Sequence, residues 1–292
     1  MKKISLFFKD SKPLAQLLGL FFIFLIGFIV SSGLQVLSLR YGVAPSAIRT
    51  QMLIQGASQL LMFFVPAWLF ACLYHDGAVS FHKIKADGKS CILGLIAAVV
   101  FLLLVPLNDR LTSWNAGWNF GSLEQQLRSI AEASSQLVEK MLSFTSPGDL
   151  ALQLVIVALL PAVCEELFFR GALQQTLHSW FGNAHVAIIA TALIFTFAHG
   201  DVYGLVPRFL MGVVLGYLFY YSGSMIVNVC AHFFNNALIV VMYYLYHIGV
   251  LSQSPSEPML MPWGTVLVCT VGAALLFAVY FLKKSTKQAS KI

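Results

Sequence analysis

Charged residues are scarce in this sequence. Asp, Glu, Lys and Arg make up only 10% of the 292 residues, whereas hydrophobic residues make up 59%. Soluble domains carry roughly 25% charged residues, so this chain has too few to cover a soluble surface. The deficit excludes a soluble globular class and indicates a protein that is largely covered by lipid.

The net charge of +6 does not indicate a nucleic-acid partner, because the lysines gather at the two ends of the apolar region. Basic residues beside membrane spans are typical of cytoplasmic flanks. The lysines concerned are Lys2, Lys3, Lys9, Lys12, Lys283, Lys284, Lys287 and Lys291.

Paired cysteines are also lacking. The five cysteines lie in or beside apolar segments and none has the Cys-x-x-Cys spacing. We interpret them as small packing residues rather than as zinc ligands or disulfide partners.

Eight apolar segments can each form a membrane helix, since about 20 apolar residues cross the hydrocarbon core. Two are short, and Pro66 predicts a kink in the second. The sequence therefore predicts an all-α, polytopic helical bundle with about eight transmembrane helices in one integral-membrane domain, residues 1–292. The segments are Leu14–Ser38, Met52–Tyr74, Cys91–Leu107, Asp149–Arg170 (with continuation through His178 left open), Ala184–His199, Leu205–Tyr221, Met225–Tyr246 and Pro262–Leu282.

One long polar stretch, residues 108–148, interrupts the apolar pattern. Within it, Ser122–Ser143 repeats apolar residues at helical spacing, with charged residues between them. This pattern predicts an amphipathic helix that lies on the membrane surface. A surface connector is the simpler interpretation, and a lid over a cavity is the alternative.

An even number of spans places both termini on one side. Because the termini and the loop with Lys83, Lys85 and Lys89 are basic, we expect that side to be the cytoplasm. In a bacterium, the protein would then lie in the inner membrane.

Two adjacent carboxylates, Glu165 and Glu166, lie inside the fourth span, where a charge is costly. Glu166 and Arg170 are four residues apart and share a helix face, so they can form an ion pair. Glu165 points about 100° away from Glu166 and has no cation nearby in sequence. Glu165 is therefore the stronger candidate for chemistry.

The other polar residues in spans are His199, at the end of the fifth segment, and His232 with Asn236, four residues apart in the seventh. Taken singly, each could merely join helices. Together, a carboxylate, two imidazoles and an amide can hydrolyse an amide bond: Glu165 as general base, a histidine orienting water, and His232 with Asn236 stabilising the oxyanion.

Three alternatives stay open. Glu165, His199 and His232 could instead bind zinc and leave one coordination position free. The carboxylates could also serve an ion- or proton-coupled transporter. A non-catalytic membrane scaffold or immunity protein could use the same polar core for binding.

In their order and spacing, the motifs Glu165-Glu166-x-x-x-Arg170, Phe195-x-x-x-His199 and His232-x-x-x-Asn236 resemble those of the CPBP (CAAX protease and bacteriocin-processing, or Abi) intramembrane proteases, which are related to the type II CAAX prenyl endopeptidases. The resemblance covers residues 149–246. It implies that Glu165 and Glu166 belong to the catalytic site, that His199 helps to activate water, and that His232 and Asn236 form the oxyanion site.

The resemblance leaves the cofactor open between none and zinc, since the family includes proteins described as metalloproteases. We favour the metal-free version because an asparagine is a poor zinc ligand but a good hydrogen-bond donor. The implied partners are the lipid bilayer and a membrane protein or lipid-anchored peptide as substrate, with no nucleic acid.

The depths of the motif residues present a difficulty. If Arg170 marks the membrane interface, Glu165 lies about 8 Å below it and His199 about 22 Å below it. We therefore predict that residues 174–182 rise out of the bilayer and lift the fifth helix, and that Glu165 and His199 come within about 8 Å of each other.

Overall fold

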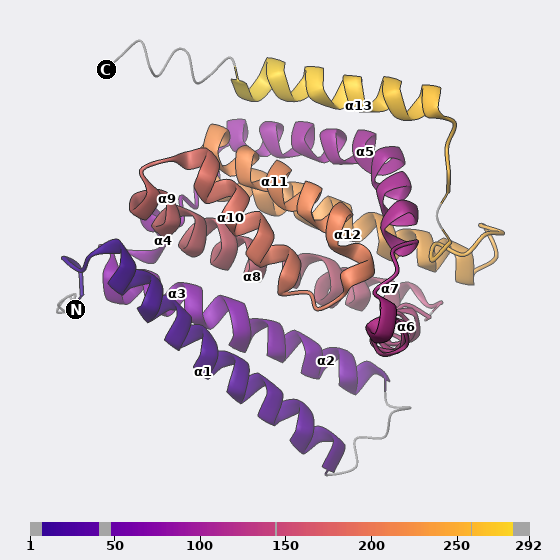
Figure 1. The fold of residues 1–292 in the computed structure, drawn as a ribbon, viewed down its shortest axis with the longest axis horizontal. Coiled ribbons are helices and arrows are strands. Elements are labelled where there is room, and N and C mark those ends of the chain that lie inside the picture. The colour runs from indigo at the N-terminus through magenta and orange to yellow at the C-terminus, as the bar shows by residue number, and fades with distance from the viewer. Residues whose placement is uncertain (1–7, 41–47, 144, 258, 283–292) are drawn as a thin grey trace.

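The computed structural model describes residues 8–40, 48–143, 145–257 and 259–282; of the terminal lysines, Lys2, Lys3, Lys283, Lys284, Lys287 and Lys291 lie outside these ranges. The described residues form helices joined by loops, with no strand among them (Figure 1). The predicted all-α class is therefore confirmed.

The helices that build the bundle follow the predicted order. They are α1 (Pro13–Arg40), α2 (Ile48–Gln59) continued by η1 (Leu60–Phe64) and α3 (Val65–Tyr74), the short α4 (Ala78–Phe81), α5 (Gly88–Ala116), η2 (Gly121–Leu123), α6 (Glu124–Met141), α7 (Pro147–Gln153), η3 (Leu154–Leu159), α8 (Leu160–Glu166), η4 (Leu167–Gln174), α9 (Gln175–Phe181), α10 (Ala184–Phe197), η5 (Val202–Gly204), α11 (Leu205–Ser222), α12 (Met225–His247), α13 (Trp263–Phe277) and η6 (Ala278–Leu282).

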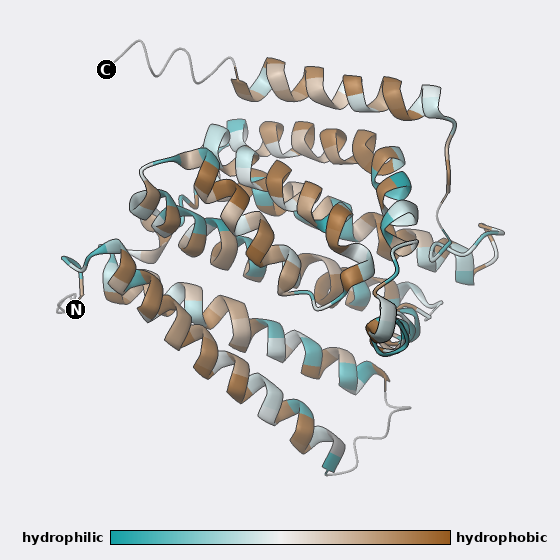
Figure 2. Cartoon of the chain, in the orientation of Figure 1, coloured by the Kyte–Doolittle hydropathy of each residue, from teal (hydrophilic) through white to brown (hydrophobic). Residues whose placement is uncertain are grey.

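Among the described residues, seven helical stretches are long and apolar enough to cross a membrane, and α10 is a shorter apolar helix. Apolar residues run along most of their length, whereas hydrophilic residues gather on α6 and in the loops (Figure 2). The chain is thus an integral, multi-pass membrane protein. Its orientation in the membrane stays a prediction.

The third span is longer than predicted. It begins at Gly88, where Asp87 accepts a hydrogen bond from the Ser90 N–H, and it continues past the predicted end at Leu107 to Ala116. Pro106 lies inside this helix, and proline commonly bends a helix rather than ending it. The polar stretch predicted to be a connector from residue 108 therefore starts as the last turns of α5.

The amphipathic helix predicted over residues 122–143 is present as α6. Most of its apolar face is not buried against the bundle: Leu123, just before the helix, is 55% exposed, and Ile130 and Leu137 are 48% and 43% exposed, whereas Met141 at its end is buried. An apolar face without a protein partner fits a helix that rests on the bilayer surface.

The fourth span is one continuous helical stretch of 35 residues, Pro147–Phe181. Ser146 caps its start by accepting a hydrogen bond from the Asp149 N–H. The continuation past Arg170 that the sequence left open is real and reaches Phe181. Two π-helical segments interrupt the stretch, and η4 follows Glu166 directly. Such widened turns are frequent at functional sites.

This length removes the difficulty over depth. Measured back from Phe181 at about 1.5 Å per residue, Glu165 lies about 24 Å along its helix, and His199 lies about 22 Å beyond Ala184. The two helices are joined by the tight turn at Gly182, which has a φ of +65°. Arg170 does not lie at the end of its helix, so the two motifs can meet at similar depth.

Aromatic side chains hold the fourth span against its neighbours. Phe168 and Phe169 both contact Phe63 of η1, and Phe169 packs edge-on against Phe195 of α10, with ring centroids 5.1 Å apart. Phe168 and Phe169 lie between Glu166 and Arg170 in the sequence, so these contacts anchor the part of the helix that carries the motif.

Candidate active site

Glu166 lies at the centre of a fully buried polar cluster. Its Oε1 accepts hydrogen bonds from Arg170 Nη1 at 2.7 Å and from His232 Nδ1 at 2.9 Å, and its Oε2 accepts one from Asn228 Nδ2 at 3.0 Å. The expected ion pair with Arg170 is therefore present. With both oxygens occupied, Glu166 has little capacity left to act on a further molecule.

Glu165, by contrast, is only lightly held. Its Oε1 accepts one hydrogen bond from Gln59 Nε2 at 3.3 Å, and its Oε2 lies 4.0 Å from His232 Nε2. The latter separation is too long for a direct hydrogen bond but suits a bridging water. Its side chain is 8% exposed, against 0% for that of Glu166.

The bonds of the two histidines define their neutral tautomers. His232 Nδ1 donates to the Glu166 carboxylate, and His199 Nδ1 donates to the Phe195 carbonyl at 2.7 Å. In each neutral ring the remaining nitrogen, Nε2, then carries a lone pair. Both histidines therefore present an acceptor, and His232 presents it toward Glu165.

Phe195 brings the three motifs together. Its buried ring lies 4.7 Å from the Arg170 guanidinium, 4.7 Å from the His199 ring and 6.3 Å from the His232 ring. His199 lies just after the end of α10 and is exposed. The predicted separation of about 8 Å stays a prediction.

The amide bound to the cluster is Asn228, a residue not predicted to belong to the site. Its Nδ2 donates to both Glu166 and the Leu215 carbonyl, while Asn236 is half-buried and accepts a hydrogen bond from Asn235. Asn228 and Asn236 each lie four residues from His232, so all three share one helix face. That spacing was the signal that could have identified Asn228.

Gln59 was also missed. It lies in the second span, far from every motif in the sequence. Among the described residues, its side chain is the one hydrogen-bond donor that contacts Glu165. Its signal was its polarity alone: an amide within a mostly apolar membrane helix indicates a contact between helices.

The donor set does not converge on a metal position. Zinc ligands lie about 2.0–2.2 Å from the ion, which puts neighbouring ligand atoms within about 3.5 Å of each other. His232 Nε2 and Glu165 Oε2 are 4.0 Å apart, and no group of three His, Cys, Asp or Glu side chains in the described part of the chain is placed to hold a metal. The described residues at this site therefore do not fit a zinc ion.

A cavity of about 510 Å³ lies between α5, α11, α12 and the loop before α13. Asn235 lines it, together with Arg208, Asp201 and Asp109, whereas Glu165 and His232 do not. Asn236 is not among its lining residues either.

The fold and the cluster define a polytopic membrane protein with a buried carboxylate–histidine site assembled from several helices. Residues 147–238 match the family model of the Rce1-like type II CAAX prenyl endopeptidases, which confirms the resemblance read from the motifs. No curated protein and no solved structure matches the chain. The family match supports a CAAX-type intramembrane protease as the kind of function.

Proposed function

We propose that the protein is an intramembrane endopeptidase that cleaves a membrane-associated protein or lipid-anchored peptide, with Glu165 as the base that activates water. The observation that carries this proposal is the contrast between the two glutamates. Glu166 is saturated by Arg170, His232 and Asn228, whereas Glu165 keeps a free oxygen at 4.0 Å from His232 Nε2.

In the proposed reaction, a water molecule bridges Glu165 Oε2 and an imidazole Nε2, with His199 helping to orient it. Glu165 takes one proton from the water, and the hydroxide oxygen bonds to the carbonyl carbon of the scissile amide. Glu165 then passes the proton to the leaving nitrogen as the C–N bond breaks, so the base is regenerated.

The oxyanion needs hydrogen-bond donors. The Asn236 amide can supply one, from one turn beyond His232 on the same helix face. His232 can supply a second from Nε2 when the ring enters the reaction as an imidazolium, which takes its proton from solvent before the substrate binds, because its Nδ1–H is committed to Glu166. Glu166 and Arg170 therefore act as positioning residues that hold His232 in one orientation.

The test compares the membrane proteome of cells that express wild type, Glu165→Gln, His199→Ala or His232→Ala. We expect the same uncleaved precursors to accumulate in all three variants. Glu132→Gln is the matched control, because it makes the same change at an exposed residue of α6. Wild-type cleavage patterns in all three variants would refute the proposal. A parallel assay with a chelator separates metal-dependent from direct glutamate catalysis.

Gln59 gives a finer test of the role of Glu165. Gln59→Leu removes the hydrogen bond to Glu165 Oε1 and leaves the Glu166 cluster intact. A hydrogen bond to a charged group contributes about 1.5–3 kcal/mol, so we expect at least about a tenfold lower cleavage rate. Unchanged cleavage would show that this bond does not position Glu165.

A further inference from the structure

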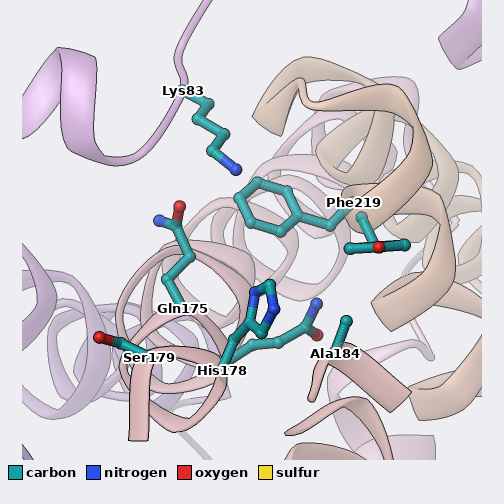
Figure 3. A pocket seen from close by; sticks show the side chains of 8 residues that line it. Lys83, Gln175, His178, Ser179, Ala184 and Phe219 are labelled. Carbon is teal, nitrogen blue, oxygen red and sulfur yellow. The ribbon is translucent and has the colours of Figure 1, made fainter. Parts of the chain in front are cut away.

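A second cavity, of about 220 Å³, lies outside the candidate active site. It is formed where α9 and α11 end, beside the loop that follows α4, and Lys83, Gln174, His178 and Ser179 are among its lining residues. Figure 3 shows the Lys83 side chain extending toward the space between Gln175 and Phe219, with the His178 ring beside it.

Lys83 is held in place by its backbone. It has a φ of +53°, an uncommon conformation for a residue other than glycine, and its carbonyl accepts a hydrogen bond from the Met225 N–H at 3.1 Å. Its ammonium lies 5.0 Å from the centre of the Phe219 ring. Within the described residues, no carboxylate forms an ion pair with Lys83, so the cavity presents a cation without a protein counter-ion.

Gln174 supplies an unused acceptor. The residue is only 5% exposed, and its Nε2 donates to the Gly216 carbonyl at 3.1 Å, while its Oε1 has no hydrogen-bond partner. A buried acceptor without a partner is unfavourable, and a water, an ion or a ligand group with a donor can satisfy it. A molecule that satisfies both features carries an anionic group for Lys83 and an N–H or O–H donor for Gln174.

The level of the cavity in the bundle indicates where such a molecule comes from. Trp180 and Phe181 end α9, and Tyr217, Tyr220 and Tyr221 lie in the last turns of α11. Tyrosine and tryptophan concentrate at the headgroup level of a membrane. Lys85 and Lys89, both exposed nearby, would add attraction to an anionic membrane surface.

We propose that this cavity binds the phosphate headgroup of a membrane lipid, with Lys83 against the phosphate and Gln174 Oε1 accepting from the ammonium or hydroxyl group of the headgroup. Phosphatidylethanolamine and phosphatidylglycerol carry such donors, whereas phosphatidylcholine has none. Gln174 is one turn from Arg170, and the two side chains bond to Gly216 and Gly212 of α11. A bound headgroup would therefore reinforce the contact that also supports the Glu166 cluster.

The test uses the purified full-length protein in non-ionic detergent, titrated with short-chain phosphatidylglycerol, phosphatidylethanolamine, phosphatidylcholine or inorganic phosphate and followed by native mass spectrometry. We expect tight binding of the first two lipids and weaker binding of phosphatidylcholine. Equal binding of all three lipids would overturn the role of Gln174. Inorganic phosphate that binds as tightly as the lipids would overturn the lipid source and indicate a site for a free anion.

A matched pair of lysine variants tests the role of Lys83. Lys83→Gln removes the charge in the cavity and should weaken phosphatidylglycerol binding by at least about tenfold. Lys140→Gln makes the same change in net charge at an exposed position on α6, outside the cavity, and should leave binding near the wild-type level. Equal losses in the two variants would indicate general surface attraction and overturn the assigned site.

Discussion

Arg170 is the residue whose replacement tests the packing of the site most directly. Its guanidinium is fully buried, bonds to Glu166 and to the Gly212 carbonyl, and lies over the Phe195 ring. In Arg170→Met a side chain of similar length keeps much of the apolar contact but leaves the Glu166 carboxylate without a positive partner. Removing one member of a buried ion pair typically costs about 3–5 kcal/mol.

The assay is thermal unfolding of the purified protein in detergent, monitored by tryptophan fluorescence. At about 2.1 cal/mol/K per residue, unfolding of the 292-residue chain has an entropy of about 0.6 kcal/mol/K, so Arg170→Met should lower the unfolding temperature by about 5–8 °C. The matched control is Arg128→Met, which breaks an exposed ion pair of the same four-residue spacing with Glu124 on α6. Exposed pairs contribute little, so this variant should unfold near the wild-type temperature.

The double variant Glu166→Gln/Arg170→Met isolates the electrostatic part of the effect. Because it removes both charges and leaves a neutral acceptor for His232, we expect it to regain more than half of the lost stability. The reasoning is refuted if Arg170→Met is no less stable than Arg128→Met. It is also refuted if the double variant is less stable than the single one.

Three further predictions concern residues around the site. Burial lowers the pKa of His82 from 6.5 to about 4, so the unfolded chain takes up the proton first as the pH falls. The free energy of unfolding should therefore fall by up to about 3 kcal/mol between pH 6.5 and pH 4. His82→Gln should flatten that part of the pH–stability curve. A Cβ at Gly171 would lie 2.3 Å from His82 Nδ1, whereas one at Gly33 would meet no atom within 4 Å; Gly171→Ala should therefore cost about 1–3 kcal/mol in chemical denaturation and Gly33→Ala almost nothing. Asn228→Ala leaves Glu166 Oε2 and the Leu215 carbonyl without their donor and should clearly lower the unfolding temperature. Asn236→Ala should instead lower the cleavage rate with little change in the unfolding temperature. The reverse pattern would contradict the roles assigned to the two amides.

Much of the fold was predictable because lipid restricts what a sequence can do. In lipid, each apolar segment must form the hydrogen bonds of its backbone N–H and C=O groups within itself. An apolar segment long enough to cross the membrane is therefore predicted to be a helix. Helix ends were harder to predict. The polar residues from 108 onward suggested that the third helix stops at Leu107, yet α5 continues to Ala116, where Asn115 bonds to the Val202 carbonyl and the Val206 N–H. Contacts of that kind, from segments distant in sequence, are invisible to local pattern.

The same limit applies to the candidate site. The spacing of Glu166 and Arg170 predicted their ion pair, because residues four apart on a helix are neighbours by geometry. That Gln59 donates to Glu165, or that Asn228 rather than Asn236 bonds to Glu166, depends on how three helices are rotated against one another. Two π-helical segments in the fourth span alter that rotation, and their positions do not follow from residue spacing.

Helix α11 carries none of the three motifs, yet its backbone binds side chains of the fourth span and of α12. Its backbone carbonyls at Gly212, Leu215 and Gly216 accept hydrogen bonds from Arg170, Asn228 and Gln174, respectively. A Cβ at Gly212 would lie 3.1 Å from the Ala192 Cβ, and one at Gly216 would lie 2.7 Å from Ile188 Cγ2, so glycine at both positions lets α10 approach closely. That close approach places Phe195 against the Arg170 guanidinium. Substitutions on α11 should therefore disturb the glutamates and histidines together, although α11 contributes no side chain to the proposed chemistry.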